Sequence, residues 1–461
     1  MSVSWRDAMR QALYGPDGFF IAGAGPAEHF RTSVHATPAF ATALLRLISQ
    51  VDAALDHPSR LDVVDVGAGR GELLQTLLGL VLAQGSAGLA GTHPGAGLAV
   101  GVSGEPTRSG RSGLIPPRAG SPETLTSTAA ARPSVDDPSS GAVRPSLAER
   151  VRFTAVELAA RPEHLPQEIE WVSEIPGGIN GVLLATEWLD NVPLDVAVHT
   201  GDGWRYLLVE PESGAETVGE LVNRDDLDWL TTWWPPNVPD ADSDPNLAAA
   251  WNDVSSGSGS GFRAARPAEG SSLTARSRPG CPETPHSDHP AASDDSSPTH
   301  GDHSEAHGAR AEIGRARDEA WADAVRKVRR GLAVAVDYGH LRESRPVDGT
   351  LTGYRGGRQV PAAPDGSCDV TAHVAMDAVA SAGAAVARCA YSLMSQREAL
   401  RALGADGGRP PLSLAGTDPA GYVRALAAAS AVAELTDPAG LGGHWWLRQP
   451  VGIPLVPAVA R

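Results

Sequence analysis

The segment best suited to chemistry is Asp65–Gly71, which overlaps the end of the short β-branched run Leu61–Val66. Its three glycines, Gly67, Gly69 and Gly71, stand at alternate positions, and an acid precedes the first of them by two residues. A buried strand that ends in glycines enters a tight turn, and residues without Cβ let a ligand lie against the backbone. The acid can meet a cationic group of that ligand. The segment therefore predicts a small-molecule site at the end of a strand.

The glycine spacing separates two classes of cofactor. Dinucleotide-binding loops usually follow the pattern GxGxxG, whereas the spacing here is GxGxG. That spacing, with an acid two residues upstream, is typical of methyltransferases that bind S-adenosyl-L-methionine. We predict that Asp65, Gly67, Gly69 and Gly71 bind this cofactor. A dinucleotide site is the main alternative, and a turn with no ligand is another.

A second acid is expected at the end of the next strand, where it would accept hydrogen bonds from the cofactor's ribose hydroxyls. Two positions compete for this role. Glu105 lies within a Gly/Ser/Pro-rich stretch, whereas Glu157 ends the clearer strand Val151–Val156. We select Glu157 because its strand is the clearer one; the long spacing from Gly67 is tolerable, since lengthening a flexible loop costs little free energy. An ordinary exposed carboxylate is the alternative interpretation of Glu157.

The loop Thr186–Pro193 follows the strand Gly181–Ala185 and contains Glu187, Asp190 and Asn191. Open α/β sheets bind ligands beyond the carboxyl ends of their strands. Two acids and an amide there suit a cationic substrate, but acids are also favoured at helix N-termini. Both interpretations stay open from the local sequence.

Asp337–His340 follows another strand, Leu332–Val336, and structural hydrogen bonding is favoured over catalysis for its Asp and His. Asp369–Thr371 is compatible with an active-site lid or with the capped start of a helix. For the pairs Trp233-Trp234 and Trp445-Trp446, packing is favoured over ligand recognition. A polar low-complexity tract is favoured over a metal site for the clustered histidines, which are His286, His289, His300, His303 and His307.

The periodicity predicts an α/β fold with a doubly wound, mostly parallel sheet, because strands alternate with helices along the chain. Further strands are expected over Ile169–Val172 and over the hairpin Val196–His199 and Arg205–Val209. Helices are expected over Trp5–Tyr14, Pro38–Ala54, Glu72–Leu82, Asp225–Trp234 and Arg315–Arg330.

The composition divides the chain into a core and two insertions. Stretches rich in Gly, Ser and Pro cover residues 84–146 and 236–309, and we predict that both are disordered. The predicted core comprises residues 61–83, 147–235 and 310–461, preceded by a helical and loop segment over 1–60.

The 461 residues carry a net charge of −17, which disfavours nucleic acid and anionic membranes as partners. The three cysteines lack metal-site spacing and indicate a reducing compartment, so we expect a cytoplasmic protein without a bound metal. No apolar run is long enough to span a membrane.

Taken together, the motifs resemble the MidA-like methyltransferases, a family that includes a mitochondrial complex I assembly factor that methylates an arginine of a respiratory-chain subunit. The resemblance is carried by short motifs in the family's order: Tyr14–Phe20, Arg31–Ser33, Asp65–Gly71, Thr186–Pro193, Asp337–Gly339, Gly366 with Asp369–Thr371, Ser395–Glu398 and Gly440–Gly442.

The resemblance implies a seven-stranded methyltransferase sheet with family-specific additions, S-adenosyl-L-methionine as cofactor, and a protein arginine as methyl acceptor. Under this hypothesis Glu187 and Asp190 are the catalytic carboxylates that hold the acceptor guanidinium. Two other functions remain open: an assembly or interaction protein that retains the fold, and a nicotinamide-dependent oxidoreductase. The intact glycine loop favours the enzyme over the first, and the glycine spacing disfavours the second.

Overall fold

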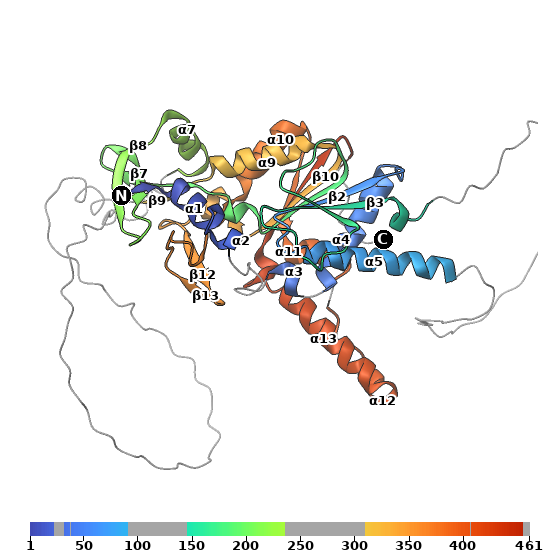
Figure 1. The fold of residues 1–461 in the computed structure, drawn as a ribbon. Coiled ribbons are helices and arrows are strands. Elements are labelled where there is room, and N and C mark those ends of the chain that lie inside the picture. Colours follow the sequence, from blue (N-terminus) through green and yellow to red (C-terminus); the bar gives the residue numbers. More distant parts are fainter. Residues whose placement is uncertain (23–31, 37, 91–144, 236–308, 406, 455–461) are drawn as a thin grey trace, which may run out of the picture.

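The computed structural model describes residues 1–22, 32–36, 38–90, 145–235, 309–405 and 407–454 (Figure 1). Most of both predicted insertions lies outside these residues, as do Arg31, Glu105, Cys281 and the five clustered histidines. The two described cysteines, Cys368 and Cys389, are both free thiols.

A seven-stranded sheet forms the centre of the molecule, in the order β16-β17-β10-β5-β2-β3-β4. Only β17 runs antiparallel to its neighbours, so the α/β fold and the mostly parallel sheet are confirmed. The strands span Ser392–Ser395 (β16), Trp445–Val451 (β17), Val328–Asp337 (β10), Ile179–Thr186 (β5), Leu61–Val66 (β2), Val151–Val156 (β3) and Ile169–Val172 (β4). Parallel pairing places the carboxyl ends of β2, β3, β5 and β10 at one edge.

Helices cover both faces of this sheet, as Figure 1 shows. On one face, α4 (Pro38–Ala54) and α5 (Glu72–Ala90) pack on side chains such as Val63 and Phe153. On the other, α9 (Arg315–Lys327) and α10 (Met376–Ala387) pack on the alternate residues of the same strands. Strands buried on both faces read as continuous apolar runs, which explains why they were visible in the sequence.

Strands outside the main sheet form smaller sheets beside it. In the largest, β1 (Val3–Ser4), β7 (Gly203–Val209), β6 (Asp195–Thr200) and β9 (Arg310–Ile313) lie in that order, and β8 (Glu216–Leu221) also pairs with β7. Antiparallel pairing of β6 with β7 confirms the predicted hairpin. The helices α1 (Trp5–Tyr14) and α7 (Arg224–Trp233) pack against this sheet.

Three predictions of secondary structure were wrong in detail. The helix α5 continues beyond Leu82 to Ala90, inside the first predicted insertion, because its Leu, Ala and Gln residues favour a helix. The helix α9 ends at Lys327, and the following residues begin β10 instead. Asp369–Thr371 is neither a lid nor a helix start, because it forms β14 and pairs with β12 (Thr352–Arg355), which also pairs with β13 (Arg358–Val360).

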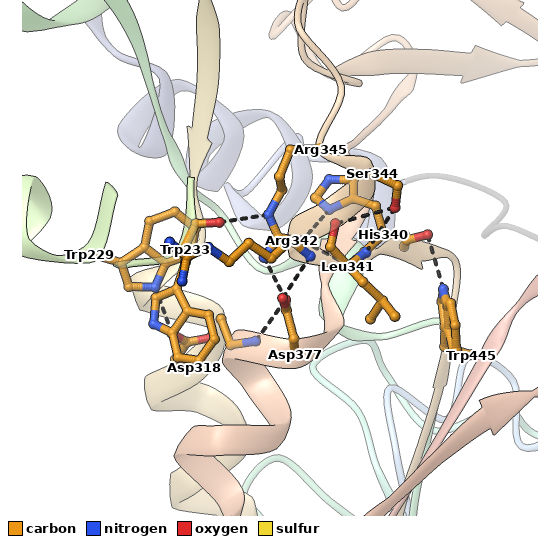
Figure 2. Close-up of polar contacts among 12 residues, drawn as sticks. Trp229, Trp233, Asp318, His340, Leu341, Arg342, Ser344, Arg345, Asp377 and Trp445 are labelled. Carbon is orange, nitrogen blue, oxygen red and sulfur yellow. Dashed lines mark hydrogen bonds and ion pairs between the residues drawn. The ribbon is translucent and has the colours of Figure 1, made fainter. Parts of the chain in front are cut away.

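The guanidinium of Arg345 ties the additions to the main fold (Figure 2). Its Nε donates to the Trp233 carbonyl at 2.8 Å, and its Nη1 donates to the His340 carbonyl at 2.9 Å. It also pairs with Asp377 on α10 and lies over the Trp234 ring. Trp234 is buried, and Trp446 has no exposed surface. Both confirm the prediction that the tryptophan pairs serve packing.

Further helices and short strands lie outside the two main groups. They are α2 (Phe19–Ala22), α3 (Ser33–Ala36), α6 (Leu147–Arg150), α11 (Gln396–Ala402), α12 (Leu412–Thr417) and α13 (Pro419–Leu435), with the 3-10 turn η2 at Leu189–Asn191 and the short β11 (Gly339–His340) and β15 (Val374–Ala375) paired in parallel. Among the helices of the described residues, none has the length and apolar character that crossing a membrane requires.

Candidate active site

A cavity of about 700 Å³ opens at the carboxyl edge of the main sheet. Its lining comes from the glycine loop after β2, the end of β3, the loop after β5, and α1 and α2. Six of the seven residues predicted for the site line it: Asp65, Gly67, Gly69, Glu157, Glu187 and Asp190. The structure therefore brings the two predicted groups, separated by about 120 residues, to the same cavity.

The glycine loop has left-handed backbone at Gly67, Gly69 and Gly71, a conformation that other residues adopt only with strain. A Cβ on Gly67 would lie 2.9 Å from Cδ1 of Trp188, which also lines the cavity. A Cβ on Gly69 would lie 3.7 Å from Oε2 of Glu72, an ordinary contact distance, so the positive φ and not lack of space favours glycine there. The loop thus presents bare backbone to the cavity, as a ligand in close approach requires.

Gly71 differs from the other predicted cofactor residues because it does not line the cavity. A Cβ at this position would lie 2.7 Å from Cδ1 of Leu165. The absence of a side chain at Gly71 therefore serves packing between the loop and the segment that follows β3.

Asp65 lies at the floor of the cavity with 3% of its surface exposed. Among the described residues, none donates a hydrogen bond to its carboxyl group. Burial, together with the nearby carboxylates of Glu157 and Glu72, raises the pKa of Asp65 to about 8. A cationic ligand would favour the ionised carboxyl and oppose both effects, so Asp65 fits the ammonium group of S-adenosyl-L-methionine.

Glu157 is fixed by three backbone N–H groups. Its Oε2 accepts from Gly69 at 3.0 Å, and its Oε1 accepts from Leu158 at 2.7 Å and Ala159 at 3.2 Å. A carboxylate offers about four acceptor sites, so it retains capacity for the hydroxyls of a ribose. The glycine loop and the end of β3 therefore form one rigid unit at this end of the cavity.

Asp190 lies in the loop after β5, with 3% of its surface exposed. Its Oδ2 accepts hydrogen bonds from the Tyr338 hydroxyl and, at 2.8 Å, from the Thr371 hydroxyl. Its Oδ1 is buried and accepts from no described residue. Burial raises the pKa of Asp190, while the two hydroxyl donors oppose that shift.

Buried groups from distant segments hold the Asp190 loop in place. The Asp337 carboxylate accepts from the Leu189 amide at 2.9 Å and from the Asp190 amide at 3.3 Å. The Asp369 carboxylate accepts from the Asn191 side chain at 2.7 Å. Burial raises the pKa of both aspartates well above the ordinary value. These contacts give Asp337 the structural hydrogen-bonding role that the sequence favoured.

Arg317 adds a further crosslink that the sequence did not signal. It is fully buried on α9 and donates to the carbonyl oxygens of Asp190, Val192, Ala372 and His373. In the sequence, a single arginine within a predicted helix does not indicate such a role. Tyr338 and Thr371 were also missed as partners of Asp190, although both stand in motifs that the family resemblance identified.

Glu187 approaches the cavity from a strained backbone position, with φ of 51°. Its amide donates to the Val336 carbonyl at 2.7 Å, and its Oε1 accepts from the Ser33 amide at 2.9 Å. The Nδ1 of His444 lies 4.0 Å from the same oxygen. Because burial lowers the pKa of His444 to about 4, this imidazole is neutral near pH 7. Left-handed backbone outside glycine is frequent at functional sites.

His340 does not line the cavity. Its Nδ1 accepts a hydrogen bond from Arg345 at 2.8 Å, and burial lowers its pKa to about 3 (Figure 2). These contacts indicate a structural role in the joint around Arg345. Within the described part of the chain, no group of His, Cys, Asp and Glu side chains is arranged to hold a metal ion.

The order of the seven strands and the cavity at the carboxyl edge define an α/β methyltransferase. Residues 142–393, more than half of the chain, match a family described as "Putative S-adenosyl-L-methionine-dependent methyltransferase". The chain belongs to this family, which confirms the MidA-like resemblance, and S-adenosyl-L-methionine is its cofactor.

Two solved structures from Burkholderia thailandensis are similar to the chain, each with 18% sequence identity and a TM-score of 0.56. One is a COG1565 superfamily member bound to S-adenosyl-homocysteine; the match covers 99% of this chain and 90% of that one. The other is an uncharacterized protein of the same superfamily, and the match covers 100% of this chain and 90% of that one. At this identity the likeness shows the fold. No curated protein sequence matches the chain.

Proposed function

We propose that the protein transfers a methyl group from S-adenosyl-L-methionine to an arginine side chain of another protein. One observation carries this proposal: the carboxylates of Glu187 and Asp190 line the same cavity as the glycine loop and Glu157. A donor and a cationic acceptor can therefore lie in contact within one cavity. The net charge of −17 also favours a cationic partner.

The cofactor, when bound, supplies a methyl group on a positively charged sulfur. Transfer forms a bond from one guanidinium nitrogen to the methyl carbon, breaks the sulfur–carbon bond, and releases one proton from that nitrogen. Most of the rate enhancement in such a displacement comes from aligning the two reactants in a site that excludes water.

Asp190 is placed to bind the guanidinium and to accept this proton. Its Oδ2 is occupied by Tyr338 and Thr371, whereas Oδ1 has no partner among the described residues. Its raised pKa makes it a better base than an exposed aspartate. Glu187 supplies a second carboxylate, and two carboxylates suit the planar fork of a guanidinium better than the compact ammonium of lysine.

The mouth of the cavity supports a peptide as the carrier of the arginine. Ile21 and Leu158 line the cavity but leave 37% and 56% of their surfaces exposed. The phenol of Tyr14, stacked on Phe20, lies in the same wall and donates to the Asn191 carbonyl at 3.2 Å. Apolar and aromatic side chains around a polar pocket are typical of surfaces that contact another protein.

Tritiated S-adenosyl-L-methionine and a cell extract depleted of this protein test the proposal. We expect label in a small number of proteins, recovered after acid hydrolysis as methylated arginine. An extract incubated without the purified protein is the control. Label in a different amino acid, or label only in small molecules, would overturn the arginine acceptor.

A further inference from the structure

We propose that Gln396 is a positioning residue that holds Glu187 in its acceptor-binding orientation through Ser33. This inference rests on the proposed function, because it assigns the acceptor guanidinium to Glu187. It also gives a role to two segments that do not line the cavity, Ser395–Glu398 and Trp445-Trp446.

A chain of hydrogen bonds runs from the core to Glu187. The Trp446 indole donates to Oε1 of Gln396 at 3.1 Å, and Nε2 of Gln396 donates to the Ser33 hydroxyl at 3.1 Å. The Ser33 amide then donates to Oε1 of Glu187 at 2.9 Å. Trp446, Gln396 and Ser33 have no exposed surface, so water cannot replace any of these contacts cheaply.

A second connection leads from the backbone of Gln396 to the same carboxylate. The Gln396 amide donates to the His444 carbonyl at 2.7 Å, and the His444 imidazole lies 4.0 Å from Oε1 of Glu187. Gln396 is thus linked to Ser33 through its side chain and to His444 through its backbone.

The base of this arrangement is rigid. Gln396 is the first residue of α11, and a capping box fixes its start: the Ser395 hydroxyl accepts from the Glu398 amide at 3.2 Å, while the Glu398 carboxylate accepts from the Ser395 amide at 2.9 Å. At the other end, Glu187 has left-handed backbone, which persists only where surrounding contacts impose it. Loss of the side-chain amide of Gln396 is therefore expected to change the orientation of the Glu187 carboxylate.

The two ends of the cavity should respond differently to this loss. The cofactor end is held by the hydrogen bonds of Glu157 to the backbone of Gly69, Leu158 and Ala159, and none of these involves Ser33 or Gln396. Binding of an arginine side chain should weaken, while binding of S-adenosyl-homocysteine should not change. General loss of stability would not produce this split.

The test compares Gln396→Met with Gln449→Met. Gln449 is equally buried, on β17, but its amide donates to the Cys389 carbonyl at 3.2 Å, away from Glu187. Arginine amide is titrated into each full-length protein saturated with S-adenosyl-homocysteine. We expect roughly tenfold weaker binding of arginine amide in Gln396→Met, and affinity close to that of the wild type in Gln449→Met.

Glu187→Gln and amide hydrogen exchange separate the inference from the proposed function. If Glu187→Gln binds arginine amide as the wild type does, the acceptor role of Glu187 is wrong. Hydrogen exchange of the Ser33 amide measures its hydrogen bond to Glu187 whether or not Glu187 binds the acceptor. We expect this exchange to be roughly tenfold faster in Gln396→Met and unchanged in Gln449→Met. Unchanged exchange in Gln396→Met, or equal acceleration in Gln449→Met, would overturn the role of Gln396.

Discussion

The two ends of the cavity are built in different ways. The cofactor end is made by consecutive residues: Asp65 and the glycines lie within seven positions, and Glu157 joins them through the Gly69 amide. The acceptor end depends on Asp190, whose partners Tyr338 and Thr371 are 148 and 181 residues away. The cofactor end is thus a local turn, whereas the acceptor end is a network of buried polar groups from distant segments.

This difference has a physical origin. A nucleoside needs bare backbone and a few fixed acceptors, which a strand and a glycine turn supply by themselves. A cationic acceptor needs carboxylates held out of water, and buried carboxylates must be supported by donors from many elements. Substitutions at the first end should therefore change cofactor binding, and substitutions at the second should change methyl transfer.

The largest effect is expected for Gly67→Val. A β-branched side chain at a left-handed position 2.9 Å from Trp188 forces the loop to move. We expect affinity for S-adenosyl-homocysteine to fall at least about 100-fold by calorimetry, with most of the fold retained by circular dichroism. Gly177→Val is the matched control, because Gly177 is exposed and no described atom lies within 4 Å of its added Cβ. Affinity near that of the wild type in Gly67→Val would exclude the loop from the cofactor site.

The second effect concerns the acceptor end alone. Asp190→Asn removes the negative charge but keeps an oxygen for Tyr338 and Thr371. We expect methyl transfer to fall by roughly 30- to 100-fold, since a buried cation loses its partner, while S-adenosyl-homocysteine binds as before. Asp377→Asn, which breaks the buried pair with Arg345 outside the cavity, controls for lost stability. If Asp190→Asn and Glu187→Gln both transfer methyl groups at the normal rate, these carboxylates do not hold the acceptor.

The third prediction is a pH dependence at the cofactor end. The Asp65 carboxyl has a pKa of about 8 without ligand, and a bound ammonium favours its ionised form, so binding lowers that pKa and releases a proton. Affinity for S-adenosyl-homocysteine should rise with pH, by up to about tenfold per unit between pH 6 and 8, and then level off. Calorimetry in buffers of different ionisation enthalpy measures the released proton. A slope that persists unchanged in Asp65→Asn would assign the effect to another group.

The smallest effect is expected for Glu157→Gln. The amide keeps one oxygen, which can accept from Leu158 and Ala159 while the NH2 group loses the bond from Gly69, and it lacks the charge that strengthens bonds to the ribose. We expect affinity for S-adenosyl-homocysteine to fall by about threefold to tenfold. A 2′-deoxyribose analogue should bind wild type and variant with nearly equal affinity. A variant that discriminates against this analogue as strongly as the wild type does would place the ribose elsewhere.

The sequence predicted the fold well because its signals are local. Apolar runs marked β2, β3, β4, β5 and β10, and the glycine spacing marked the turn. The boundaries of α5 and α9 were less accurate, since helix propensity changes gradually along a chain.

The support of the acceptor end could not be predicted in the same way. Arg317 stands in an ordinary helix pattern, and only the tertiary fold brings its guanidinium to the Asp190 carbonyl. Asp369–Thr371 pairs as a strand because β12 lies beside it, a contact that no local pattern encodes. Ser33 and Gln396 were visible only as fragments of family motifs, and their hydrogen bond spans 363 residues.

The central claim is that donor and acceptor ends belong to one cavity, and a crystal structure with S-adenosyl-homocysteine tests it directly. We predict the ribose beside Glu157 and the sulfur facing Asp190, with no more than about 8 Å between the sulfur and Oδ1, the span of a methyl group, a nitrogen and a hydrogen bond. A nucleoside bound in the cavity with its sulfur directed away from Asp190 and Glu187 would contradict the account.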